Sequence, residues 1–133
     1  MSINWIAVLV CVVVGQIFLT VWFTALFGEP WARAYGAPDK AQHTKETPPY
    51  TYAIGLASTV LLTIGLAYLQ MRLGVSSSGE GVVLGIWVAL CFCVATALPG
   101  YAFLKRWSAF AIAISSQTLL ILILSAILAS WPG

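Results

Sequence analysis

Charged side chains are scarce in this chain of 133 residues, and most of its length has none. Six basic and four acidic residues make up 8% of the sequence, whereas an average soluble domain is about a quarter charged. All of them fall outside four long segments, which are 1–28, 47–71, 81–104 and 107–133. A soluble domain of this size has too much surface to hide four such segments, so the composition excludes a soluble enzyme or binding domain.

Histidine and cysteine are equally few, which limits the chemistry available to the chain. Its one histidine, His43, lies in a polar stretch, and its three cysteines, Cys11, Cys91 and Cys93, lie in apolar segments where they act as small hydrophobic residues. A metal site requires more ligands close together. The net charge of +2 is too small for a nucleic-acid-binding protein. The sequence therefore predicts no metal, no cofactor and no catalytic residues, and it favours a protein that is not an enzyme.

The charge-free segments have the length of membrane-spanning helices. A bilayer core requires about 20 apolar residues per helix, and the segments predict spans at about 4–27, 50–72, 81–103 and 107–131. We expect the first segment to be retained rather than cleaved as a signal peptide, because no basic residue precedes it. The predicted fold is an all-α integral membrane protein, in which residues 1–133 form one four-transmembrane-helix bundle in the lipid bilayer.

The only sizeable polar loop, residues 28–49, follows the first predicted span. Residues 29–36 predict a short helix along the membrane interface, because Pro30 suits the first turn of a helix and Gly36 suits its end. Residues 37–49 predict a polar coil. Residues 74–80, which join the second and third spans, are rich in Gly and Ser and predict a flexible loop.

The basic residues predict an orientation. Four spans place both termini on one side, together with a single basic residue, Arg72. The other side carries loop 28–49 and the link between the last two spans. Because basic residues accumulate in cytoplasmic loops, we expect loop 28–49 to be cytoplasmic and both termini to be non-cytoplasmic. The basic residues on the predicted cytoplasmic side are Arg33, Lys40, Lys45, Lys105 and Arg106.

Small residues recur at helical spacing within every span, and such residues let membrane helices approach closely. In the third span they recur every four residues, and we expect this row to be a packing face. Pro99, late in the same span, predicts a kink or a helix end. The row in the third span comprises Gly81, Gly85, Ala89, Cys93 and Ala97. The other rows are Ala7, Cys11 and Gly15 in the first span, Thr51, Gly55, Ser58 and Gly65 in the second, and Ser108, Ala111, Ser115, Thr118, Ser125 and Ala129 in the fourth.

Two amides, Gln16 and Gln117, lie near the middle of their spans and need hydrogen-bond partners there. They could bond to each other across the first and fourth helices, or to Ser115 and Ser116. Gln117 is turned about 130° from the small-residue row of its own helix. Its face therefore predicts contact with a third helix of the bundle, with another subunit, or with a ligand.

Two motifs resemble a known family. The chain opens with Asn4-Trp5-Ile6-Ala7-Val8-Leu9, and the first span ends in Trp22-Phe23-Thr24-Ala25-Leu26-Phe27-Gly28-Glu29-Pro30-Trp31. Both resemble the bacterial membrane family called domain of unknown function 1761, with Phe23 where Tyr is usual and Ala25 where Pro is usual. The resemblance implies a short bacterial protein with four spans. It implies no activity, cofactor or catalytic residue.

The second motif also has a physical interpretation as an anchor. Trp22, Phe27 and Trp31 are expected at the inner headgroup level, and Gly28 lets the backbone turn between them. The sequence as a whole favours a bacterial inner-membrane protein that acts through helix contacts, either as an accessory subunit of a larger membrane complex or as a homo-oligomer. The alternative is a binding protein, carrier or membrane enzyme that holds a lipophilic molecule near Gln16 and Gln117.

Overall fold

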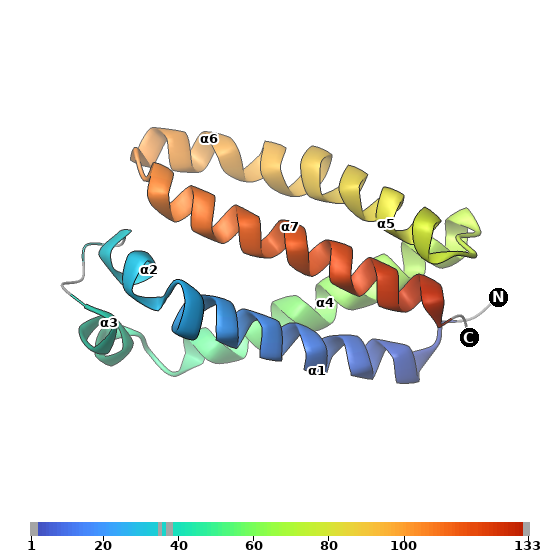
Figure 1. Ribbon diagram of the computed structural model, residues 1–133, viewed down its shortest axis with the longest axis horizontal. Helices are drawn as coiled ribbons and strands as arrows, with labels where there is room; N and C mark the ends of the chain where they lie inside the picture. Colours follow the sequence, from blue (N-terminus) through green and yellow to red (C-terminus); the bar gives the residue numbers. More distant parts are fainter. Residues whose placement is uncertain (1–2, 35, 37–38, 132–133) are drawn as a thin grey trace.

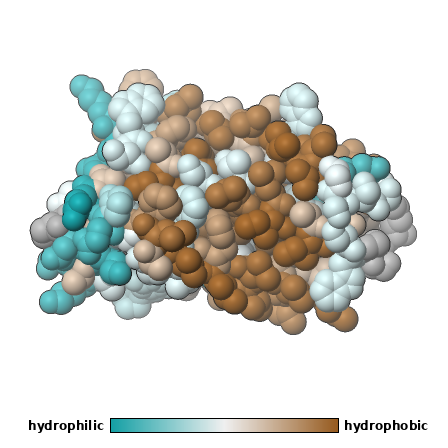
Figure 2. All heavy atoms as spheres, in the orientation of Figure 1, coloured by the Kyte–Doolittle hydropathy of each residue, from teal (hydrophilic) through white to brown (hydrophobic). Residues whose placement is uncertain are grey.

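The computed structural model describes residues 3–34, 36 and 39–131. This part of the chain is helical and contains no strand. Four of its helical stretches are long and apolar enough to cross a membrane, which confirms the predicted fold class. They lie side by side, and on the face shown in Figure 2 apolar residues cover the middle of the molecule while hydrophilic groups gather mainly at one end (Figures 1 and 2). The four stretches are Trp5–Leu26, Tyr50–Leu73, Ser78–Leu104 and Trp107–Ser130.

The first span comprises helix α1 (Trp5–Val21) and a π-helical turn, η1 (Trp22–Leu26). Asn4 caps its start, because the Asn4 side-chain oxygen accepts hydrogen bonds from the backbone N–H groups of Ile6 and Ala7. The Asn4 amide also donates to the carbonyl oxygen of Trp131 at 3.1 Å. This bond joins the start of the first span to the end of the last one.

Two short helices follow at the opposite end of the molecule, α2 (Gly28–Ala34) and α3 (Lys40–Glu46). Helix α2 agrees with the predicted short helix over residues 29–34; Tyr35 lies outside the described residues, and Gly36 adopts a φ of +86°. The prediction of a coil over 37–49 was wrong for the part that forms α3; residues 37 and 38 lie outside the described residues. Asp39 starts α3 by accepting a hydrogen bond from the Gln42 N–H at 2.8 Å.

Helix α4 (Tyr50–Leu73) ends at Gly74, whose φ of +69° suits a residue without a Cβ. Helix α5 (Ser78–Trp87) then begins earlier than the predicted residue 81. The Ser77 hydroxyl accepts a hydrogen bond from the Glu80 N–H at 3.2 Å, and the Glu80 carboxylate accepts one from the Ser76 N–H at 3.2 Å. This pair of bonds closes the first turn of α5, so that the last part of the predicted flexible loop is helical.

The third span continues through a π-helical segment, η2 (Val88–Val94), into helix α6 (Ala95–Leu104). Pro99 lies inside α6, so the helix does not end there as one of the two sequence alternatives predicted. It ends at Lys105, whose φ of +56° reverses the chain. Helix α7 (Trp107–Ser130) starts two residues later and returns across the molecule beside α6 and α5 (Figure 1).

Helix α7 is the centre of the bundle, because α1, α4, α5, η2 and α6 all contact it. The half of α7 towards Ser130 carries the largest fully buried apolar side chains, Leu120, Ile121 and Leu124. Helix α4 contacts α1 and α7, and all of its buried residues lie between Thr59 and Gln70. Residues 50–58 of α4 are exposed at every position.

The burial of α4 corrects the predicted packing face of the second span. Gly55 and Gly65 have no neighbouring atom within 4 Å of a Cβ position, and Ser58 is exposed. A hydrocarbon environment is as apolar as the bundle interior, so small residues alone do not determine which face of a helix is covered. The buried residues of α4 are Thr59, Thr63, Leu66, Ala67 and Gln70.

Candidate functional site

The structure gives Gln16 a partner on α4 in the middle of the bundle. The Thr59 hydroxyl, which is buried, lies 3.0 Å from Oε1 of Gln16 and 3.1 Å from the carbonyl oxygen of Gly55, and its single proton is shared between these two acceptors. Sequence reasoning missed this contact, because a threonine in an apolar helix usually bonds only to its own backbone. Gln16 does not bond to Gln117.

Gln117 is half-buried on α7, and its side chain forms no hydrogen bond with any described residue. The two serines that were expected to join it behave differently. Ser115 is exposed, whereas Ser116 is fully buried and donates to the carbonyl oxygen of Ala113, in its own helix, at 2.6 Å. The four polar residues that the sequence singled out are therefore not brought together into one site.

A second polar contact joins three spans nearer the chain termini. Nε2 of Gln70 on α4 donates to the carbonyl oxygen of Ser125 on α7 at 3.0 Å, and only 6% of Gln70 is exposed. A Cβ at Gly81 on α5 would lie 3.4 Å from the same amide nitrogen. Gln70 was visible in the sequence, but its position near the end of a span was compatible with a solvated residue.

Part of the row of small residues in the third span is buried against α7. Gly81, Gly85 and Ala89 are buried, whereas Cys93 and Ala97 are half-buried. A Cβ at Gly85 would lie 2.9 Å from the Ser125 hydroxyl oxygen, which is buried and has no hydrogen-bond partner. The backbones of α5 and α7 therefore approach closely beside Ser125, and the two glycines are what permits this approach.

The four anchor residues lie at the end of the bundle that carries α2 and α3 (Figure 1). Nε1 of Trp22 donates to the carbonyl oxygen of Ile112 on α7 at 3.1 Å, and the Trp22 and Phe27 rings lie 4.5 Å apart. Trp31 instead contacts Phe23, with 4.7 Å between ring centroids. A Cβ at Gly28 would lie 2.5 Å from Cδ of Lys40, so Gly28 makes room for the start of α3.

The described residues contain no group of three His, Cys, Asp or Glu side chains that could hold a metal ion. Away from the helix ends, the polar side chains within the spans are amides, hydroxyls and thiols, which can bind and position a partner.

Comparison with known proteins adds one finding. A family model described as "Protein of unknown function (DUF1761)" matches residues 6–129. No curated protein and no solved structure matches the chain.

Proposed function

The chain belongs to the DUF1761 family of four-span membrane proteins, and from that premise we propose that it is a small subunit of a bacterial inner membrane that acts through helix contacts. The observation that carries this proposal is the half of α4 that begins at Tyr50. All of residues 50–58 are exposed, although the same helix has buried residues between Thr59 and Gln70. Among the described residues, this half-helix is the longest run of consecutive exposed positions in any of the four spans.

The sequence of the exposed half-helix suits protein contact. Thr51, Gly55 and Ser58 follow one another at helical spacing, and the position of Gly55 has open space around it. In a bilayer, small residues of this kind allow a second helix to approach closely, which is the main source of helix association where no hydrophobic driving force exists. We propose that a helix of another subunit, or of a second copy of this chain, lies against residues 50–58.

Gln117 supports the same proposal from another helix. An amide in hydrocarbon without a hydrogen-bond partner is costly, and the cost is relieved when a neighbouring helix supplies a donor or acceptor. A lipophilic ligand with a polar group would relieve it too. The amide oxygen of Gln16 already accepts from Thr59, whereas its NH2 group donates to no described residue.

The proposed topology follows the charge distribution. Five of the six basic residues belong to α2, α3 and the α6–α7 turn, and these elements lie at one end of the bundle (Figure 1). We propose that this end is cytoplasmic and that both termini lie on the other face of the membrane.

Replacement of Gln117 tests the association. In mild detergent, the wild-type particle should be heavier than the 14.3 kDa chain alone after the bound detergent is subtracted. Gln117→Leu should weaken the association constant by about 3- to 20-fold, which corresponds to the measured range of interhelical hydrogen bonds in membranes. The measurement is particle mass by native mass spectrometry over a dilution series.

Ser115→Ala is the matched control, because it also removes a polar group from α7. Ser115 lies two residues from Gln117 and therefore on a different face of the helix. This variant should leave the association constant unchanged. Equal dissociation of the wild type and Gln117→Leu would contradict the role of Gln117. A wild-type monomer that retains a defined small molecule would contradict the subunit proposal and favour ligand binding.

A further inference from the structure

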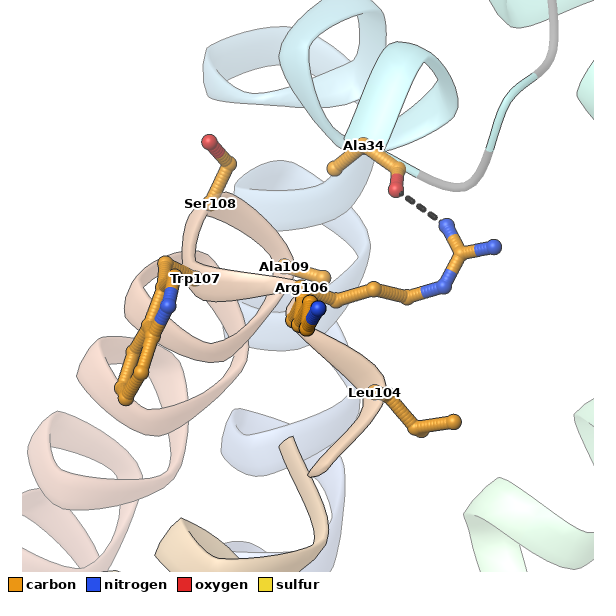
Figure 3. Close-up of a pocket in the computed structure, with 7 residues that line it drawn as sticks. Ala34, Leu104, Arg106, Trp107, Ser108 and Ala109 are labelled. Carbon is orange, nitrogen blue, oxygen red and sulfur yellow. Dashed lines mark hydrogen bonds between the residues drawn. The ribbon is translucent and has the colours of Figure 1, made fainter. Parts of the chain in front are cut away.

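The turn between α6 and α7 borders an open cavity of about 440 Å³. The cavity lies between this turn and the end of α2, and its walls include Ala34, Lys105, Arg106, Trp107 and Ser108 (Figure 3). Two segments that are distant in the sequence, the end of α2 and residues 104–109, therefore meet around one space, at the end of the bundle where the basic residues gather.

The charge of the cavity wall is entirely positive. Lys105 and Arg106 both line the cavity, and no carboxylate does. Nη1 of Arg106 donates to the carbonyl oxygen of Ala34 at 2.7 Å, which holds the guanidinium group at the edge of the cavity (Figure 3). The Lys105 ammonium group forms no hydrogen bond or ion pair with any described residue. Two cations beside one cavity, of which Arg106 is held in place by its hydrogen bond, favour an anionic occupant.

The backbone adds to this preference. Arg106 precedes α7 and provides no side-chain cap, so the first N–H groups of α7 beside the cavity have no side-chain acceptor at the N-cap position. The positive end of the α7 helix dipole lies at this same turn and adds to the positive potential of the two cations.

Apolar side chains beside the cavity favour an anion that carries hydrocarbon chains over a free inorganic ion. Trp107 and Leu104 line it and are 56% and 66% exposed, and the neighbouring Phe103 is 89% exposed. A free phosphate ion would leave these side chains uncovered. A phospholipid would place its phosphate in the cavity and its acyl chains against the apolar residues. Basic pockets at the ends of transmembrane helices bind lipid headgroups in this way.

We propose that this cavity binds the phosphate of an anionic phospholipid, with Lys105 and Arg106 holding the phosphate oxygens and Trp107 and Leu104 contacting the chains. Ammonium and guanidinium groups form strong charge-assisted hydrogen bonds with phosphate oxygens. The site uses the α6–α7 turn and not the exposed half of α4, so it does not depend on the proposed association of subunits.

Lipid binding to the delipidated full chain in mild detergent tests the proposal, with native mass spectrometry to count bound lipids. The probes are phosphatidylglycerol, phosphatidylcholine with the same acyl chains, and inorganic phosphate. We expect the wild type to bind phosphatidylglycerol about tenfold more tightly than phosphatidylcholine, because both lipids carry the phosphate but the choline cation of phosphatidylcholine is repelled by Lys105 and Arg106. Inorganic phosphate at millimolar concentration should not displace the bound lipid.

Lys105→Asn is the informative variant, because asparagine tolerates the positive φ of this position and lacks the charge. It should reduce the affinity for phosphatidylglycerol about tenfold, and Lys105→Arg should retain it, which separates lost charge from a damaged turn. Lys45→Asn is the matched control, since Lys45 is an exposed cation of α3 at the same end that does not line the cavity.

Three results would overturn the proposal. Equal affinity of the wild type for the two lipids would show that the cavity does not select an anionic lipid. An equal loss of affinity in Lys105→Asn and Lys45→Asn would show general attraction to a basic surface. Displacement of the lipid by inorganic phosphate would assign the cavity to a free anion.

Discussion

Gly81→Ala is expected to lower the free energy of unfolding by about 1–3 kcal/mol, the usual cost of an extra methyl group in a closely packed interior. The added Cβ would lie 2.5 Å from Cβ of Ala129 and 2.7 Å from the carbonyl oxygen of Ser125. The carbonyl oxygen is part of the α7 backbone and the alanine Cβ is bonded directly to it, so neither atom can move aside as a flexible side chain would. The two helices must separate, which also strains the hydrogen bond from Gln70 to Ser125.

Gly79→Ala is the control within the same helix. No atom lies within 4 Å of its Cβ position, and alanine is a better helix former than glycine, so this variant should be neutral or stabilising. The measurement is the unfolding free energy from titration with denaturing detergent in mixed micelles. If both variants had the same stability, the close contact of α5 with α7 at Gly81 would be contradicted.

Leu124→Ala is expected to cost about 2 kcal/mol, near the lower end of the values for a buried leucine. Leu124 is fully buried, and its Cδ2 would lie 3.8 Å from a Cβ at Gly15 on α1. The Cys11 thiol also donates to its carbonyl oxygen at 3.9 Å. The expected value is at the lower end because side chains that leave the bundle enter lipid rather than water, so the loss is one of packing.

Leu119→Ala provides the comparison, because Leu119 lies on the same helix and is 41% exposed. It should cost only a few tenths of a kcal/mol, as is usual for exposed positions. The same detergent titration measures both variants. A loss at Leu119 as large as that at Leu124 would mean that the assignment of the buried face of α7 is wrong.

The number and approximate length of the spans were predictable, because a span is determined by continuous apolar sequence and needs no knowledge of its neighbours. The helix start at Ser77 was less visible. There, Glu80 is a capping residue inside the first turn of α5, whereas the prediction took this charge as part of the preceding loop. Helix α3 was missed for a similar reason, since a polar stretch with a good cap at Asp39 has no apolar periodicity to reveal it.

The covered faces of the helices were harder to predict than the helices themselves. In the fourth span the predicted row of small residues is divided: Ser125 and Ala129 are buried, whereas Ser108, Ala111 and Ser115 are exposed. Which part of a row is covered depends on where neighbouring helices cross it. The crossing of α4 depends on contacts such as Gln16 with Thr59, which join residues distant in the sequence.

The two candidate sites illustrate the same limit. Gln117 stood out in the sequence because its position in an apolar helix is visible there. The cavity beside Lys105 could not be seen, because Ala34 is brought to it only by the fold, through its hydrogen bond with Arg106. Sequence alone showed that both basic residues lie at a helix junction, but not that they border an open space.

The central claim, that protein covers residues 50–58 of α4 in the membrane, is tested most directly by photocrosslinking in cells. Tyr52 on α4, which is 62% exposed, would be replaced by benzoylphenylalanine, which is close in size and shape. Phe103 on α6 is the matched control, since it is also aromatic, exposed and near the same end. We predict a protein adduct of defined mass from position 52 and none from position 103. The absence of a protein adduct at position 52, or the same adducts at both positions, would contradict the claim.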